Sequence, residues 1–147
     1  KIAYQKTGKP IIVQDSAFYI ESLNGFPGPY VKYVNETIGA RGILNLMKGI
    51  VNRRAYFKMA LGYVEKTGVV HIFTNDISLG GGSIANHIAE ENSKKSWSEI
   101  WKIYIPNWSN GKTLSELSPE EIDTHEKNKD VSSEFYFFAR WLKEQQN

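Results

Sequence analysis

Two runs of β-forming residues separated by a short turn signal place the strongest constraint on the fold of this chain. Residues 55–63 carry Ala, Phe, Met, Leu and Tyr at every second position, and β-rich residues resume at 69–74 after Glu-Lys-Thr-Gly at 65–68. A period of two puts alternate side chains on one face of a strand, and a turn ending in glycine between two such runs is typical of a β-hairpin. We therefore expect a sheet built around this hairpin.

The other segments predict helices and further short strands around that sheet. Residues 10–13 form an apolar, β-branched run that predicts a buried strand ending at residues 14–16. Ser118, Pro119 and Glu121 form an N-terminal helix signal, with a capping serine, a proline at the first position and an acid three residues after the serine. Apolar spacing predicts two short helices within 31–47, strands near 84–88 and 101–105, and a last helix with a stripe of Phe135, Phe138, Ala139 and Leu142. This mixture predicts an α/β or α+β fold around one sheet.

Composition narrows the class of protein. The chain has 147 residues, 41% hydrophobic and 23% charged, and no linker-like stretch, so a single domain over 1–147 is expected. Eighteen basic and 16 acidic residues give a net charge of +2, which predicts no nucleic-acid surface. No apolar run reaches the ~20 residues that cross a bilayer, so no membrane is expected. The absence of cysteine excludes disulfide scaffolds and thiol chemistry and fits a reducing, cytoplasmic setting.

Asp15 is the carboxylate that most strongly suggests chemistry. A carboxylate directly after a strand and before a loop rich in glycine and proline lies where α/β sheets usually carry function. An Asp that caps nearby backbone amides is an equal alternative at this position. Mg²⁺ takes one or two carboxylates and completes its shell with water and phosphate oxygens, so one well-placed Asp can form half of a metal site.

The histidines and glycines give weaker signals. No two of the three histidines have the i, i+4 spacing of a helical zinc site, and His71 fits a packed strand residue. The glycines at 80–82 lack the Gly-Lys-Ser/Thr ending of a phosphate-binding loop, so they predict a flexible turn.

Two neighbouring motifs resemble the inosine triphosphate pyrophosphatase (Ham-type) family. The first is the β-run with Asp and Ser at 10–16, and the second is Leu-Asn-Gly-Phe-Pro-Gly-Pro-Tyr at 23–30, which is quite specific. Further similarity lies at Gly-Ser-Ile in 82–84, at residues 106–117, and at Glu-Lys-Asn in 126–128. The resemblance spans most of the chain.

The resemblance implies a Mg²⁺-dependent hydrolase that cuts between the α and β phosphates of ITP, dITP or XTP. The products are the nucleoside monophosphate and pyrophosphate. It also implies an α/β fold with an elongated mixed sheet flanked by helices, in two lobes with a central substrate cleft. Members are usually homodimers, so a nucleoside triphosphate and a second copy are the expected partners.

Four residues take expected roles from this resemblance. Asp15 matches the carboxylate that orders the metal and activates the attacking water, and Ser16 beside it is expected to bind substrate. Lys32 matches a lysine facing the cleft, although a solvated helix lysine is an equal alternative. Lys127 matches the Glu-Lys-Asn lysine that lies by the nucleotide, where a charge run alone would indicate a solvated helix end.

Two departures concern the phosphate and metal site. The Thr-Gly-Asn-x-x-Lys strand and turn with which the family opens has no match, so we expect that an N-terminal strand-turn-helix segment is missing from this chain. Gln14 stands where the family often has an acid, which predicts weaker metal binding.

Two further departures concern the base pocket. The family's Ser-His-Arg after Glu-Lys-Asn is replaced in residues 129–134, and its Phe-Gly-Trp/Tyr-Asp-Pro appears only as residues 96–100. Trp97 can still stack on a base, and Ser98 or Glu99 replaces the Asp. Losing groups that bond a base edge predicts altered base selectivity. The alternative is a catalytically impaired nucleotide-binding or dimeric interaction protein on the same fold.

Overall fold

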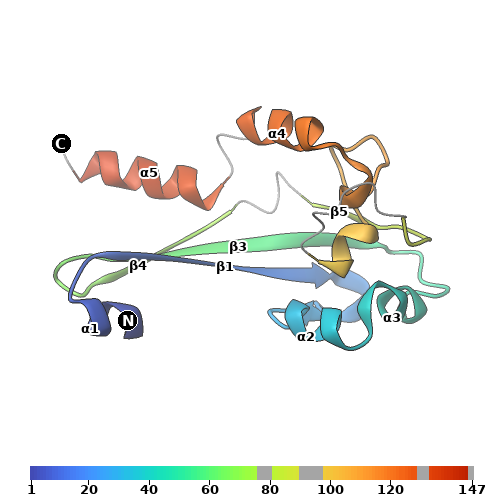
Figure 1. The fold of residues 1–147 in the computed structure, drawn as a ribbon, viewed down its shortest axis with the longest axis horizontal. Coiled ribbons are helices and arrows are strands. Elements are labelled where there is room, and N and C mark those ends of the chain that lie inside the picture. Colours follow the sequence, from blue (N-terminus) through green and yellow to red (C-terminus); the bar gives the residue numbers. More distant parts are fainter. Residues whose placement is uncertain (76–80, 90–97, 129–132, 146–147) are drawn as a thin grey trace.

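The computed structural model describes residues 1–75, 81–89, 98–128 and 133–145. Its centre is a long antiparallel pair, β1 (Ile11–Ile20) and β3 (Arg54–Val64), in continuous register from Ile11 opposite Val64 to Ile20 opposite Ala55. Strand β4 (Val70–Thr74) pairs with the far half of β3, which confirms the predicted hairpin (Figure 1).

Three short strands complete the sheet. They are β2 (Pro27–Gly28), β5 (Gly82–Ile84) and β6 (Tyr104–Pro106), and the order is β2-β1-β3-β5-β6 with β4 also paired to β3. Every recorded pairing among the described strands is antiparallel. The helices are α1 (Ile2–Thr7), α2 (Val31–Glu36), α3 (Gly39–Leu46), α4 (Pro119–Asn128) and α5 (Glu134–Glu144), with 3₁₀ turns η1 (Glu21–Leu23), η2 (Glu99–Lys102) and η3 (Leu114–Glu116).

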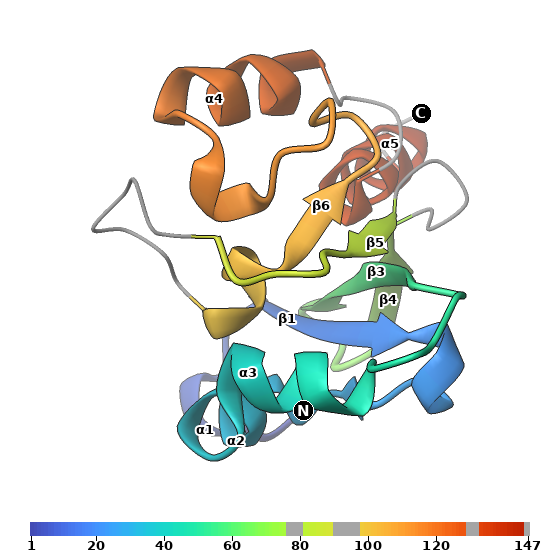
Figure 2. The same ribbon diagram turned by 90° about the vertical axis from the view of Figure 1, so that its right-hand side faces the viewer.

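The hydrophobic core lies at the end of the sheet where β1 terminates. Phe18 and Ile20 are fully buried there, since alternation in β1 turns both toward the same face. Figure 2 looks along the sheet at this end, with α2, α3 and η2 gathered beside β1. The remaining core residues are Val34, Ala40, Ile43, Met47, Ala55, Ile84, Ile100, Ile103 and Tyr104. Burial raises the pKa of the Tyr104 phenol to about 12.

A second packing region lies at the other end of the sheet. Phe138 and Trp141 of α5 pack against Phe73 of β4 with ring centroids 5.4 and 5.7 Å apart. Figure 1 shows α5 lying along the β3–β4 hairpin, while α1 lies on the opposite side. The expectation of an α/β fold with an elongated sheet flanked by helices is confirmed. No helix in the described ranges has the length and apolar character to cross a bilayer.

Strand β1 differs from its prediction. The prediction of a buried strand at 10–13 is wrong, because the strand continues to Ile20 and its first half is exposed. The exposed fractions of Ile12 and Val13 are 48% and 52%. Strand β2 pairs only with Phe18 and Tyr19, so the first half of β1 lies at an edge of the described sheet.

Three smaller expectations also change. The strand near 84–88 ends at Ile84, and residues 99–102 form η2 rather than a strand, with only residues 104–106 extended. On α5 the stripe is rotated, since Phe138 is buried and Phe135 is 50% exposed.

Candidate active site on strand β1

Asp15 lies in the middle of β1, opposite Ala60 of β3. The prediction that Asp15 lies at the end of a buried strand is therefore wrong, because Asp15 is an exposed residue within an exposed segment of β1. Its Oδ1 accepts a hydrogen bond from the Ser16 backbone N–H at 2.8 Å, which fixes one carboxylate oxygen. The bond to a nearby backbone amide, foreseen for a capping Asp, is thus present.

The register of β1 separates Asp15 from its neighbours. Side chains alternate along a strand, so Asp15 points away from the face that carries Gln14, Ser16 and Phe18. Ser16 contributes its backbone N–H to the Asp15 carboxylate, while its own side chain lies on the other face. Of the expected site residues, these two are joined directly.

The Asp15 carboxylate fits a hard divalent cation that brings most of its own ligands. Among the described residues no group of three or more His, Asp or Glu side chains is arranged to hold a metal. Mg²⁺ keeps several waters and binds through one or two carboxylates together with phosphate oxygens. An exposed carboxylate with one oxygen fixed and the other open to solvent suits that coordination.

Lys32 and Glu99 lie on two elements that are joined to each other. Asn35 of α2 and Ser98, the N-cap of η2, exchange two side-chain hydrogen bonds of 2.9 and 3.1 Å. The Lys32 side chain is 80% exposed, 4.0 Å from Glu36. Glu99 forms a 2.6 Å ion pair with Lys102. No contact joins either side chain to Asp15 among the described residues.

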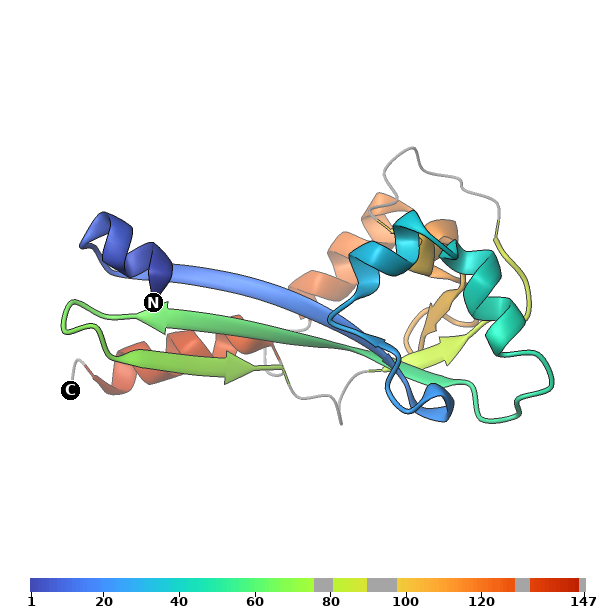
Figure 3. The ribbon, with the colours of Figure 1, turned by 90° about the horizontal axis from the view of Figure 1, so that it is seen from below.

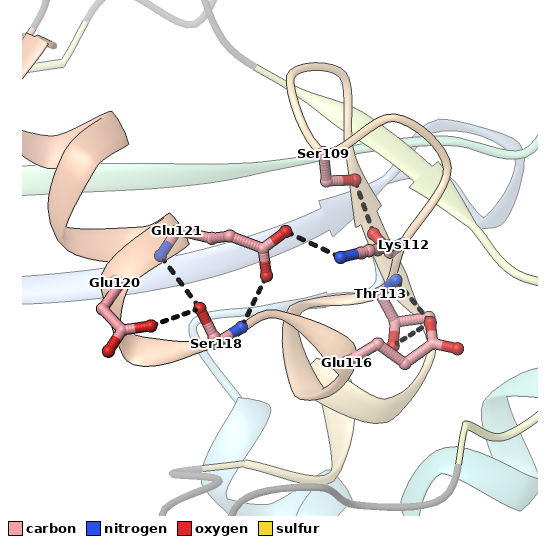
Figure 4. A network of polar contacts seen from close by, with 7 residues as sticks. All are labelled: Ser109, Lys112, Thr113, Glu116, Ser118, Glu120 and Glu121. Atoms are coloured by element: carbon pink, nitrogen blue, oxygen red, sulfur yellow. Dashed lines mark hydrogen bonds and ion pairs between the residues drawn. The ribbon is translucent and has the colours of Figure 1, made fainter.

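Helix α4, which carries Lys127, begins at the expected capping motif. The Glu121 N–H donates to Ser118 Oγ at 3.2 Å, and the Ser118 N–H donates to Glu121 Oε2 at 2.7 Å (Figure 4). Lys112 adds a 2.6 Å ion pair to Glu121. The bonds from Lys112 and Ser118 lower the pKa of the Glu121 carboxyl. Lys127 itself is exposed near the other end of this helix.

The segment before α4 is fixed by a second capping box. Glu116 Oε2 accepts bonds from the Thr113 N–H at 2.7 Å and from Thr113 Oγ1 at 2.8 Å, and Thr113 is fully buried. These bonds lower the pKa of the Glu116 carboxyl, with His87 and Lys112 adding to the effect. Figure 4 shows both capping boxes along one continuous loop.

One contact next to Asp15 was not predicted. Gln14 Nε2 donates a hydrogen bond to Oε1 of Glu134, the first residue of α5, and Glu134 is only 3% exposed. The two residues lie 120 positions apart in the chain, so no local pattern indicates the contact. Trp97 and residues 129–132 lie outside the described residues.

The sequence matches one family over nearly its whole length. A sequence profile of the Ham1 family matches residues 1–133. The chain is 43% identical over 117 residues to a dITP/XTP pyrophosphatase of Methanopyrus kandleri, covering 80% of this chain and 58% of that protein. It is 34% identical over 142 residues to the dITP/XTP pyrophosphatase of Hyperthermus butylicus, covering 97% of this chain and 68% of that one.

Solved structures agree on the fold. The Ham1 protein of Staphylococcus aureus superposes with a TM-score of 0.72 at 22% identity, covering 98% of this chain and 72% of that one. The nucleoside-triphosphatase / dITP/XTP pyrophosphatase of Mycobacterium abscessus superposes with a TM-score of 0.72 at 24% identity, covering 86% of this chain and 66% of that one. Together with the profile match, these similarities show that the chain belongs to the Ham1 family.

Proposed function

We propose that this chain hydrolyses nucleoside triphosphates to the monophosphate and pyrophosphate, with deaminated purine nucleotides as the first class to test. The observation that carries the proposal is the Asp15 carboxylate, held by the Ser16 N–H on an open segment of β1. The relatives named dITP/XTP pyrophosphatases support the reaction class.

Asp15 would hold Mg²⁺ and orient the attacking water. When bound, Mg²⁺ supplies neutralisation of phosphate charge. The water oxygen forms a bond to the α-phosphorus, and its proton passes to the Asp15 carboxylate. The bond from the α-phosphorus to the α–β bridging oxygen breaks, which releases pyrophosphate. The Asp15 oxygen that does not accept the Ser16 N–H would take this proton.

The remaining residues would bind the substrate. Lys32 and Lys127 are exposed cations suited to phosphate oxygens. Ser16 would act through its backbone N–H, which holds Asp15, because its hydroxyl lies on the opposite face of β1. Trp97 would stack on the base and Glu99 would accept a hydrogen bond from it. Replacement of the family's base-reading groups favours altered base selectivity. We also propose a cytoplasmic homodimer.

A pyrophosphate-release screen with Mg²⁺ over ITP, dITP, XTP, dUTP and the common nucleotides tests this function. Release from one or a few nucleotides, lost in Asp15→Asn and kept in Asp123→Asn, would support it. Asp123 is an exposed acid on α4 and so controls for loss of surface charge. No release from any nucleotide would overturn the proposal.

A binding protein without turnover is the second candidate. It is favoured by the lack of an acidic or histidine cluster around Asp15 among the described residues. Nucleotide binding measured by calorimetry, without turnover and unchanged in Asp15→Asn, would support this candidate over the enzyme.

A further inference from the structure

We propose that Glu134 is a positioning residue for Asp15 and acts through the side chain of Gln14. The inference rests on the role proposed for Asp15. It is carried by the hydrogen bond from Gln14 Nε2 to Glu134 Oε1, which joins the strand residue preceding Asp15 to the first residue of α5.

The backbone around Asp15 is restrained on one side. Strand β3 pairs with β1 along its whole length, but β2 pairs only with Phe18 and Tyr19. In the ranges that the structure describes, no strand pairs with the other edge of residues 11–17, and Figure 3 shows this edge between α1 and α2. An edge strand leaves one row of N–H and C=O groups unpaired, so one ladder and the side-chain contacts restrain its backbone.

Glu134, in contrast, belongs to a fixed element. Ser133 caps α5, since its Oγ accepts the Tyr136 N–H at 3.1 Å. The helix is then packed on the hairpin by Phe138, whose ring centroid is 5.2 Å from that of Tyr63 on β3. The Glu134 carboxylate therefore has a defined position relative to β3.

The hydrogen bond from Gln14 to Glu134 has a carboxylate as its acceptor. Hydrogen bonds to an ionised carboxylate are shorter and stronger than those between neutral groups. Glu134 is buried at 3% exposure, where a carboxylate requires a donor, and the Gln14 amide supplies it. A carboxylate in the first turn of a helix is further stabilised by the helix dipole.

Fixing residue 14 fixes the direction of residue 15. Gln14 and Asp15 project from opposite faces of the same strand, so a twist of β1 that moves one side chain moves the other. With Gln14 held by Glu134 and Asp15 Oδ1 held by Ser16, the open oxygen of Asp15 keeps one orientation. Catalytic groups misplaced by about 1 Å lose about 100-fold in rate.

The test compares kcat and KM for pyrophosphate release, with Mg²⁺ and the nucleotide found in the screen, in five variants. Glu134→Ala and Gln14→Ala are each expected to lower kcat about 10- to 100-fold and to change KM less than about threefold. The double variant is expected to be no slower than either, because both remove one bond. Glu134→Gln keeps an acceptor oxygen but not the negative charge, so it is expected to restore part of the kcat that is lost in Glu134→Ala. Glu144→Ala, at the exposed end of α5, is the matched control.

Amide hydrogen exchange supplies a readout that does not depend on turnover. In Glu134→Ala the amides of residues 14–17 are expected to exchange about tenfold faster, while those of the β3–β4 hairpin stay protected. Equal acceleration throughout the hairpin, additive effects in the double variant, or wild-type kcat in folded Glu134→Ala would overturn the proposal. If Glu134→Ala does not fold, Gln14→Ala decides, because Gln14 is exposed. An inactive wild type would refute the proposed function, while exchange still tests the link from Glu134 to β1.

Discussion

The ring of Phe138 on α5 packs against the ring of Tyr63 on β3, with centroids 5.2 Å apart and ring planes at 50°. Tyr63 also faces Trp141, one turn further along the helix, at 5.8 Å. This aromatic contact fixes α5 on the hairpin, and the first residue of α5 in turn bonds to β1. The last helix thus connects the two long strands of the sheet.

Phe138→Ala is expected to lower the free energy of unfolding by about 3–5 kcal/mol, because a ring that is 8% exposed leaves a cavity against Tyr63 and Phe73. Phe135→Ala on the same helix is the control, since that ring is 50% exposed. Urea unfolding measures both. Equal losses in the two variants would contradict the packing described for α5.

Asp15→Asn is expected to lower turnover about 100- to 10,000-fold, the range for loss of a positioned acid–base group. Its melting temperature is expected to stay within a few degrees of wild type, because Asp15 is exposed and its recorded bond is local. Steady-state pyrophosphate release and thermal unfolding give the two quantities. Full activity in a folded variant would rule out the role of Asp15.

Gly82→Ala is expected to destabilise the sheet by about 1–3 kcal/mol or more, because a Cβ there would lie 2.2 Å from the carbonyl oxygen of Ile105 on the neighbouring strand. Gly62→Ala is the control: its Cβ would meet the exposed Val13 side chain at 3.3 Å, which can rotate away. Thermal unfolding of the two variants checks the difference. A milder effect at Gly82 than at Gly62 would contradict the β5–β6 pairing.

The capping carboxylate of Glu116 makes stability depend on pH. Its pKa is lowered in the folded state from an ordinary value of 4.5, so its contribution is present above that pH and lost as the pH falls through the folded-state pKa. Glu116→Gln is therefore expected to lower the free energy of unfolding at pH 7 and to lower it less at pH 3. Urea titrations at both pH values test this, with Glu144→Gln as the surface control. The same deficit at both pH values would refute it.

Local signals in the sequence predicted the elements whose structure is determined locally. The β3–β4 hairpin followed from strict alternation in residues 55–63 and the turn at 65–68. The start of α4 followed from Ser118 and Glu121, whose reciprocal bonds span three residues. The motifs at 10–16 and 23–30 indicated the family, which the profile match confirms.

The features that the sequence did not predict depend mostly on contacts between residues far apart in the chain. The polar residues 14–16 read as the end of a strand, yet they continue β1 because ten residues of β3 lie opposite it. Residues 99–102 have strand-like composition, but Ser98 caps them into a 3₁₀ turn. The bond between Gln14 and Glu134 joins segments 120 residues apart, and no pattern in either segment indicates that they meet.

The order of the strands also bears on how the chain folds as it is made. Strand β4 follows its partner β3 after a short turn. Strand β1, in contrast, is synthesised before β3, and Val64, the last residue of β3 that pairs with β1, follows Ile20 by 44 positions. At synthesis rates of about 5–20 residues per second, β1 spends roughly 2–9 s without its main partner. The first half of β1 mixes polar and apolar residues. During this interval the unpaired strand is therefore less prone to self-association than a fully apolar strand would be.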